Sequence, residues 1–411
     1  MLAFRPVMLL GGRYFKGNPP LPLRALPLFL PDPRPKPLLP ALSCGMVEPI
    51  PPETGRPGTM AARSRRKLPE CAMLNGYDII GDIHGCADKL EALLARLGYL
   101  KQDGVWKHAD RIAVFLGDYI DRGPEILETL KIVRDMRAAG AAVALMGNHE
   151  FNAVCWNTPD PAHPGQHLRP HTEKNRLQHE ASLDQLAGCY QMWIGWMRTL
   201  PLWLELGDLG GHGGRLHLAH ACWSPDAIEV LKQAERCGEA MIEGRHDAPT
   251  LSDKGYEYAG RDSFSIEYHA IETVLKGPEV PLPEGVTFCD KDGVERDSIR
   301  VKWWLGPGRS CREMSLMGTD CTEALPENAR VEPEDWQAIA VDCPTFFGHY
   351  WLGAEEAVKS FGPKVACLDF SAVKGGPLVA YRWNRGDTEI KDENFVWIDK
   401  PFTAERKIFF P

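Results

Sequence analysis

Three short blocks of the sequence place acidic, imidazole and amide side chains directly after apolar runs. In chain order they are Gly81-Asp-Ile-His-Gly85, Gly117-Asp-Tyr-Ile-Asp-Arg-Gly123 and Gly147-Asn-His-Glu150. Carboxylate, imidazole and amide groups together favour Mn, Fe or Zn over Ca or a thiolate-bound ion. Gathered in one place, such groups could hold two divalent cations that bridge and acidify a water. The blocks therefore predict a dinuclear metal centre that performs hydrolysis.

The spacing within these blocks suits ligands of two adjacent cations. Asp82 and His84 are two residues apart in an extended segment, so their side chains point the same way and can chelate one cation. Asp118 follows the next strand and can offer one oxygen to each of two cations. Asn148 can give a neutral amide oxygen to the second. We therefore expect Asp118 to be the ligand that both cations share.

The blocks need a scaffold that brings strand ends together. Apolar runs predict strands at Tyr77–Ile80, Arg111–Leu116 and Ala141–Met146, and amphipathic spacing predicts helices at Asp88–Leu97 and Pro124–Ala138. Repeated strand–helix units indicate an α/β domain, whose sites lie beyond the carboxyl ends of the strands. Each predicted strand delivers one polar block at that edge.

These blocks resemble those of the metallophosphoesterase superfamily. The closer similarity is to its phosphoprotein phosphatase branch, which includes calcineurin-like protein phosphatases and the bacterial diadenosine tetraphosphate hydrolases. The GDxHG, GDxxDRG and GNHE elements occur complete and in order, and Asp121-Arg122-Gly123 favours this branch over generic nucleases. The resemblance covers roughly Tyr77 to Trp383. It implies an α/β fold in which a two-sheet β-sandwich is flanked by helices, with an inserted cap region.

The resemblance also implies a ligand set. Asp82, His84 and Asp118 would hold the first metal, and Asp118, Asn148 and two further histidines would hold the second. For the first of these histidines we choose His220, because the rival His217, three residues earlier, lies inside the predicted strand. For the second we choose His349, in Phe346-Phe-Gly-His-Tyr350.

Three further residues receive catalytic roles from the same resemblance. His149 would protonate the leaving oxygen, and Asp121 would orient its imidazole and raise its basicity. Arg122 would hold the phosphate oxygens with its planar guanidinium. The other histidines of the following segment are predicted to be solvent-facing loop residues: His163, His167, His171 and His179.

The C-terminal part and the middle of the chain give weaker indications. Residues Val365 to Trp383 predict two strands joined by a turn at Gly375-Gly376, a hairpin similar to one that closes the second sheet in the tetraphosphate hydrolases.

The long stretch between His220 and His349 predicts a cap over the metal site. Trp303 and Trp304 could stack on a nucleobase or anchor the cap, and we favour anchoring. Several cations of the cap could meet an anionic substrate: Arg261, Arg300, Lys302, Arg309 and Arg312.

Composition divides the chain. Residues 1–73 hold 15 of the 34 prolines and eleven Lys/Arg against four Asp/Glu, which predicts a disordered extension. We favour an upstream start-codon assignment for it, with translation beginning at Met60 or Met73, over a transit peptide. We expect the core at 74–235 and 341–400, interrupted by the cap at 236–340.

Composition also excludes several classes of protein. No run approaches the roughly 18 apolar residues of a membrane helix. The net charge of −9 argues against a general nucleic-acid binder. The twelve cysteines are scattered without a CxxC pair, which disfavours a zinc ribbon and suits reduced thiols of a cytoplasmic protein.

These observations rank the functions. First comes a phosphoserine/phosphothreonine-type phosphomonoesterase that uses two divalent metal ions, with Mn favoured and Fe or Zn as alternatives. The alternative is a dinucleoside polyphosphate hydrolase, so the partner is either a phosphorylated protein or a small phosphorylated or nucleotide substrate. A metal-binding scaffold without activity is disfavoured because no expected ligand is missing, nor His149 or Arg122. A nucleic-acid phosphodiesterase is disfavoured because the acidic core offers no basic groove.

Overall fold

The computed structural model describes residues 74–207, 215–233, 237–242, 246–261, 265–289, 295–317, 322–354 and 356–399. The predicted N-terminal extension, 1–73, lies outside these residues, as does the side chain of Arg261. Within the described residues, no helix is long and apolar enough to span a bilayer.

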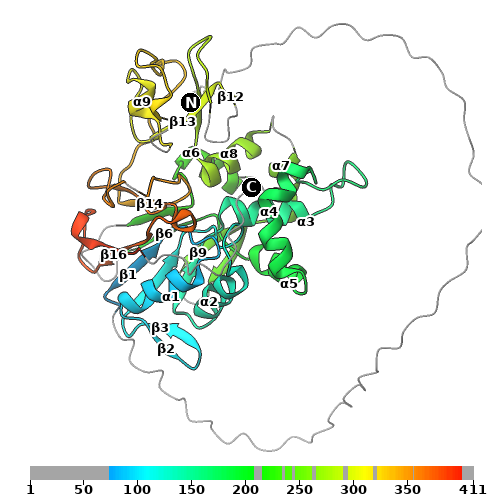
Figure 1. Ribbon diagram of the computed structural model, residues 1–411, viewed down its shortest axis with the longest axis vertical. Helices are drawn as coiled ribbons and strands as arrows, with labels where there is room; N and C mark the ends of the chain where they lie inside the picture. Colours follow the sequence, from blue (N-terminus) through cyan, green and yellow to red (C-terminus); the bar gives the residue numbers. More distant parts are fainter. Residues whose placement is uncertain are drawn as a thin grey trace, which may run out of the picture. The chain divides into compact units, whose positions relative to one another are not determined.

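The first sheet carries three of the polar blocks. Its order is β17–β16–β1–β4–β5, in which β1 (Gly76–Ile80), β4 (Arg111–Phe115) and β5 (Ala142–Ala144) are parallel. Figure 1 labels β1 and β16 of this sheet. On the other side of β1, the strands β16 (Leu378–Asn384) and β17 (Phe395–Ile398) are antiparallel. The three parallel strands end at the same edge, so their blocks meet there.

The second sheet has the order β15–β14–β7–β6. The strands β15 (Val365–Cys367), β14 (Thr345–Phe347) and β7 (Leu216–Ala219) are parallel, and β6 (Trp203–Leu206) runs antiparallel to β7. The segments that follow β7 and β14 hold the two predicted histidine ligands. This sheet therefore supplies the remaining part of the site.

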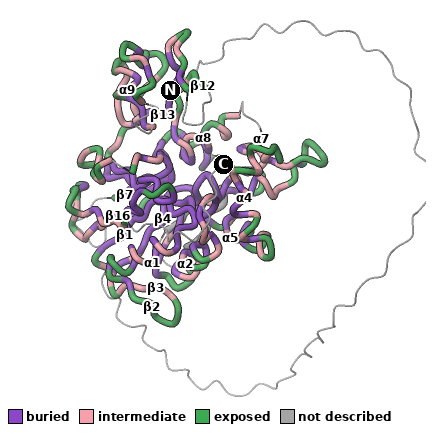
Figure 2. The backbone as a smooth tube through the Cα atoms, in the orientation of Figure 1, coloured by how far each residue is buried: buried purple, intermediate pink, exposed green. Residues whose placement is uncertain are grey.

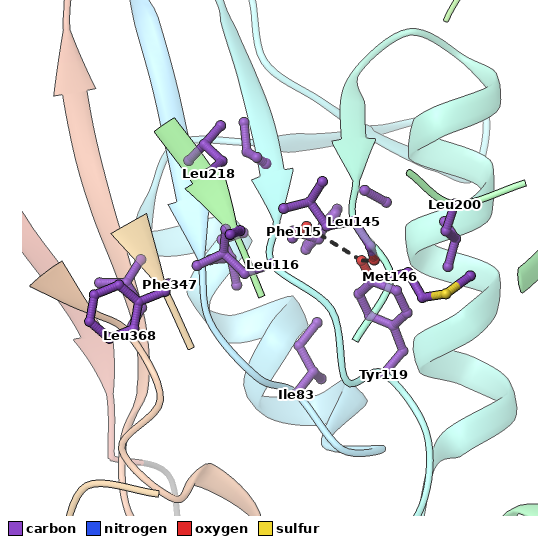
Figure 3. Close-up of a cluster of buried hydrophobic side chains, with 14 of the residues drawn as sticks. Ile83, Phe115, Leu116, Tyr119, Leu145, Met146, Leu200, Leu218, Phe347 and Leu368 are labelled. Atoms are coloured by element: carbon purple, nitrogen blue, oxygen red, sulfur yellow. Dashed lines mark hydrogen bonds between the residues drawn. The ribbon is translucent and has the colours of Figure 1, made fainter. Parts of the chain in front are cut away.

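One apolar core joins the two sheets. The ring of Phe346 on β14 lies 4.8 Å from that of Tyr381 on β16. Figure 3 shows another part of this core, in which Leu116 and Leu218 lie near Phe347 and Leu368. The prediction of a two-sheet β-sandwich of the α/β kind is confirmed. Figure 2 shows that the buried residues run through the strands of both sheets.

Helices surround the sheets. In α1 (Ala87–Arg96) the buried residues Leu90, Leu93 and Leu94 follow helical spacing, and α1 contacts β16. The other helices of this part are α2 (Ile126–Ala138), α3 (Asn148–Asn157), α4 (Glu173–Leu186) and α5 (Tyr190–Met197). A small hairpin and two short 3₁₀ helices complete it: β2 (Leu100–Gln102), β3 (Val105–Lys107), η1 (Ala372–Lys374) and η2 (Asp392–Asn394).

The middle of the chain folds in two parts. The elements are α6 (Pro225–Gln233), β8 (Cys237–Ile242), β9 (His246–Leu251), α7 (Asp253–Arg261), α8 (Ile266–Lys276), β10 (Glu279–Pro281), β11 (Phe288–Cys289), β12 (Glu295–Arg296), β13 (Ser298–Arg300) and α9 (Cys311–Met314). Helices α7 and α8 add apolar side chains to the main core, whereas β10, β13 and α9 enclose a second, smaller core. The predicted boundaries at 236 and 340 stay predictions.

The two tryptophans of this region behave as anchors. Trp303 is fully buried, and its ring lies 5.4 Å from that of Phe347 at the end of β14. Trp304 lies 5.7 Å from the same ring. The cap is thus attached to the strand that precedes His349.

The predicted C-terminal hairpin was wrong. Strand β15 pairs in parallel with β14 in the second sheet, whereas β16 pairs antiparallel with β1 in the first. The two strands belong to different sheets, and an isolated antiparallel bridge between Asp369 and Leu378 links the segments that join them. The turn between them is fixed by Asp369, which accepts the backbone N–H groups of Trp351 and Ser371 at 2.8 and 3.0 Å. It carries the chain from one sheet to the other.

Candidate metal centre and active site

The structure brings all six predicted metal ligands to one place, where the carboxyl ends of strands from both sheets meet. All six are buried. They follow five strands: Asp82 and His84 after β1, Asp118 after β4, Asn148 after β5, His220 after β7 and His349 after β14.

Asp118 lies between two imidazoles. Its Oδ2 atom is 3.5 Å from Nε2 of His84 and 3.4 Å from Nε2 of His220. Its Oδ1 atom accepts the backbone N–H of His149 at 3.0 Å. One carboxylate therefore contacts a predicted ligand of the first cation and a predicted ligand of the second.

Asn148 and Asp82 connect the remaining ligands. Oδ1 of Asn148 is 3.0 Å from Nε2 of His220 and 2.8 Å from Nδ1 of His349. Oδ2 of Asp82 accepts the backbone N–H of His349 at 3.0 Å. The ligands from the two sheets thus form one continuous cluster.

Backbone carbonyl groups orient two of the imidazoles. Nδ1 of His84 lies 2.7 Å from the carbonyl oxygen of Ile120, and Nδ1 of His220 lies 2.9 Å from that of Leu116. A ring that donates from Nδ1 presents the lone pair of Nε2. Both Nε2 atoms face Asp118. This is the orientation that a metal-binding histidine needs.

Buried atoms without a partner show that the cluster fits cations. Among the described residues, Oδ1 of Asp82, Nε2 of His84 and Nε2 of His349 are buried and accept or donate no hydrogen bond. An orphaned buried polar atom costs roughly 1–3 kcal/mol. Metal coordination would satisfy Oδ1 of Asp82 and Nε2 of His84, whereas His349 presents its Nδ1 atom to Asn148. Groups that include His84 with Asp118, and Asp118 with His220 and His349, have ligand atoms close enough to hold an ion.

The pKa shifts of the buried groups also indicate that the cluster suits bound cations. Burial raises the pKa of Asp82 well above its ordinary value, and the nearby Asp369 raises it further. Burial opposes ionisation of Asp118 too, but His220 and His149 outweigh it and lower its pKa. Burial alone would lower the pKa of His220, yet Asp118 raises it to about 10. Divalent cations would neutralise these buried carboxylates without protonation.

The site stores backbone strain. Five of the eight described non-glycine residues with positive φ belong to the predicted site: His84, Asp118, Asp121, Arg122 and His349. Such conformations persist only where the surroundings enforce them. Glu150 does so here, because its buried carboxylate accepts the N–H groups of Gly147, Asp118 and Tyr119 at 2.8 to 3.0 Å. Burial, followed by Asp118, raises the pKa of Glu150 to about 8.

The three predicted catalytic residues adjoin the cluster. Nδ1 of His149 is 2.5 Å from Oδ2 of Asp121. Nε2 of His149 accepts from the Arg122 guanidinium at 3.3 Å, and that guanidinium lies over the ring of Trp351 at 4.0 Å. The His149 ring is 4.7 Å from that of His84. An imidazole held by a carboxylate therefore stands beside the metal ligands.

Comparison with known proteins identifies the family. A family model described as calcineurin-like phosphoesterase matches residues 77–233. The chain is 47% identical over 194 residues to the asymmetrical bis(5'-nucleosyl)-tetraphosphatase PrpE of Bacillus velezensis, which covers 45% of this chain and 74% of that protein. It is 32% identical over 338 residues to the symmetrical bis(5'-nucleosyl)-tetraphosphatase of Yersinia pestis, covering 80% of this chain and 94% of that protein.

The chain is a calcineurin-like phosphoesterase. It is accordingly a metal-dependent hydrolase of phosphoric ester or anhydride bonds, in a family that uses divalent metals. Among solved structures, a protein serine/threonine phosphatase of Saccharomyces cerevisiae aligns over 80% of this chain and 80% of its own, with a TM-score of 0.38 and 12% identity.

One histidine of the phosphoesterase was predicted wrongly. His179 does not face solvent: it is buried on α4, and its Nδ1 atom is 2.7 Å from Oδ1 of Asp121. Its Nε2 atom is 2.7 Å from the hydroxyl of Tyr190, and Ser182 donates to Asp121 at 2.5 Å. Asp121 is thus held from the side of α4 as well as by His149. Helical spacing of His179, Ser182 and Leu186 on one face was the signal that could have shown this.

Other side chains of the phosphoesterase lie outside the cluster. His217, the rival to His220, stacks on Trp223 at 3.8 Å and lies 3.3 Å from Glu205. Of the cap cations, Arg312 pairs with Glu327 at 3.3 Å. The remaining predicted loop histidines, His163, His167 and His171, are exposed or half-buried.

Proposed function

We propose that this phosphoesterase holds two divalent cations, with Mn²⁺ as the first expectation and Fe or Zn as alternatives. The first cation would be bound by Asp82, His84 and Asp118, and the second by Asp118, Asn148, His220 and His349. The position of Asp118 carries this proposal, because its Oδ2 atom is nearly equidistant from Nε2 of His84 and Nε2 of His220.

Bound cations of this kind polarise a phosphoryl oxygen and acidify a water. The protein contributes burial, which strengthens electrostatic interactions within the site. Its backbone fixes the ligands in advance, since Ile120 and Leu116 hold the rings of His84 and His220. Little rearrangement of the side chains is then needed when substrate binds.

We propose His149 as the general acid. Asp121 holds its Nδ1 atom, so Nε2 is the atom from which a proton can reach the leaving oxygen. In the structure Nε2 is occupied by Arg122, whose own Nε atom is buried without a hydrogen-bond partner among the described residues. Substrate phosphate would draw the Arg122 guanidinium to its oxygens and release Nε2.

For the substrate we propose a dinucleoside polyphosphate. The sequence alone ranked a phosphoserine or phosphothreonine monoester first and this substrate second. We reverse that order because similar proteins are named as dinucleoside tetraphosphatases. Two of them are the asymmetrical and symmetrical bis(5'-nucleosyl)-tetraphosphatases described above. A phosphomonoester remains the second candidate, because the metal ligands and Arg122 require only one phosphate.

Asp118→Asn should lower the metal content of the protein from two ions per chain to one or fewer. A neutral amide has one good ligand oxygen and cannot bridge two cations, whereas the carboxylate can. Inductively coupled plasma mass spectrometry after dialysis against Mn²⁺ measures the ratio. Asp135→Asn, at a surface pair with Arg134, is the matched control and should keep both ions. Retention of two ions by Asp118→Asn would refute the shared ligand.

His149→Ala should slow poor leaving groups more than good ones. We expect kcat to fall by about 10²-fold or more on phenyl phosphate, and by much less on p-nitrophenyl phosphate, whose leaving group needs no proton. His179→Phe should also lower kcat more on phenyl phosphate than on p-nitrophenyl phosphate, but by a smaller factor than His149→Ala. His179→Asn keeps a hydrogen-bond donor for Asp121 and should recover much of the lost kcat. The exposed His163→Phe is the control. Equal losses on both substrates would remove both histidines from proton transfer.

The substrate proposal predicts a preference that a panel can measure. The enzyme with Mn²⁺ should show a higher kcat/KM on diadenosine tetraphosphate than on a phosphoserine peptide or on p-nitrophenyl phosphate. Excess chelator should abolish turnover of all three. A preference for the phosphopeptide would instead establish the monoesterase.

A further inference from the structure

A second group of potential metal ligands lies in the second sheet. Ligand atoms of His217, Asp342 and Cys343 all lie within 4.8 Å of one another. His217 is on β7, and Asp342 and Cys343 lie just before β14. These strands pair in parallel with His217 opposite Thr345, and the backbone N–H of His217 donates to the carbonyl oxygen of Pro344 at 2.9 Å. The pairing of β7 with β14 therefore holds the three side chains together.

This group is separate from the catalytic centre. Its histidine pairs with Thr345, the first residue of β14, whereas His220 and His349 follow the carboxyl ends of β7 and β14. None of its three residues is among the six proposed ligands of the catalytic cations. An ion bound by this group would be additional to those two cations.

The surroundings of His217 leave one ring nitrogen for a cation. Burial lowers the pKa of His217, which favours the neutral imidazole that binds metals. Its Nε2 atom lies 3.3 Å from Oε2 of Glu205, its cross-strand partner on β6. A carboxylate oxygen only accepts, so in the neutral ring Nε2 carries the hydrogen and Nδ1 carries the lone pair. The ring also stacks on Trp223 at 3.8 Å, which fixes its plane. A carboxylate on the far nitrogen is the usual partner of a metal-binding histidine.

Two lone pairs then face each other across the group. Nδ1 of His217 is 3.7 Å from Oδ1 of Asp342, which is too long for a hydrogen bond. The other oxygen of this carboxylate, Oδ2, is 3.4 Å from the guanidinium of Arg215, so Oδ1 is the atom turned to the histidine. A cation between Nδ1 and Oδ1 would replace the repulsion of two acceptors by coordination.

The thiol of Cys343 completes the group. It is buried, and burial together with the adjacent Asp342 raises its pKa to about 12. Without a cation the thiol therefore keeps its proton. A metal ion bound to the sulfur takes the place of that proton, as it does at other cysteine ligands.

We propose that His217, Asp342 and Cys343 bind one zinc ion, with a water as the fourth ligand. Imidazole, carboxylate and thiolate are the side-chain types that bind zinc, at about 2.0–2.3 Å. Ligand atoms around a tetrahedral ion of that size are roughly 3.4–3.8 Å apart. Nδ1 of His217 and Oδ1 of Asp342 already have this spacing. The thiolate selects zinc over Mn²⁺, so the site differs in metal preference from the catalytic centre.

The place of the site in the fold indicates a structural role. Glu205 on β6 holds His217 on β7, and the other two ligands lie just before β14. One ion would therefore connect three neighbouring strands of the second sheet. An ion that binds the folded chain and not the unfolded one stabilises the fold by mass action.

Cobalt substitution tests the thiolate ligand. Co²⁺ bound to a thiolate gives a charge-transfer absorption in the near ultraviolet, which the oxygen and nitrogen ligands of the catalytic centre do not give. The full chain is freed of metal with chelator, refilled with Mn²⁺ and titrated with Co²⁺. The wild type should show the band, saturating at about one Co²⁺ per chain. Cys343→Ser should abolish it, and Cys289→Ser, at an exposed thiol, is the matched control and should keep it.

Glu205→Gln tests the orientation of the histidine. The Glu205 side chain is 46% exposed, so this variant perturbs the core little. It replaces the carboxylate that holds Nε2 of His217, and loss of such a partner weakens metal binding by about 10- to 100-fold. Competition between the protein and a chromogenic chelator measures the Kd for Zn²⁺. Glu334→Gln, at an exposed residue, is the matched control and should keep the wild-type Kd.

The outcomes decide the assignment without reference to catalysis. A wild type that lacks the thiolate band, or a band that survives in Cys343→Ser, overturns the zinc site. An unchanged Kd for Zn²⁺ in Glu205→Gln overturns it as well, and this variant decides the matter if Cys343→Ser does not fold. The two catalytic cations are tested separately, by the metal content of Asp118→Asn.

Discussion

The buried carboxylate of Asp118 is the group on which the other features of the site depend. It contacts imidazoles that follow strands of different sheets, His84 from the first and His220 from the second. Its second oxygen accepts the N–H of His149 and so fixes the start of α3. A buried carboxylate is costly unless cations or donors surround it. This one accepts the N–H of His149, and the proposed cations would satisfy the rest. The position of Asp118 therefore depends on the packing of the two sheets, and the chemistry of the site depends on that position.

That constraint explains why the backbone around Asp118 is strained. Bringing Asp118 and its neighbours to one point requires left-handed φ angles that these residues disfavour. Glu150 compensates, because its carboxylate accepts the backbone N–H groups of Asp118 and Tyr119 in this loop and of Gly147 in the loop before α3. The Asn-His-Glu block thus serves three purposes with adjacent residues. Asn148 joins the ligands, His149 reaches Asp121, and Glu150 holds the loop that presents Asp118.

The sequence was sufficient for the parts of the molecule that local pattern determines. The polar blocks follow apolar runs, and β1, β4 and α1 lie within one or two residues of the predicted ranges. The sequence was insufficient for features that depend on contacts between residues far apart in the chain. Whether β15 and β16 share a sheet depends on the partners β14 and β1, which lie far apart in the chain. His179 was misjudged for a related reason: its burial depends on Asp121, 58 residues earlier.

Anomalous diffraction tests the dinuclear centre most directly. Crystals grown with excess Mn²⁺ would be measured on the high-energy side of the manganese absorption edge. We predict two anomalous peaks about 3.5–4 Å apart, with the carboxylate of Asp118 between them. A single peak, or peaks that do not contact Asp118, would contradict the shared carboxylate and with it the proposed mechanism.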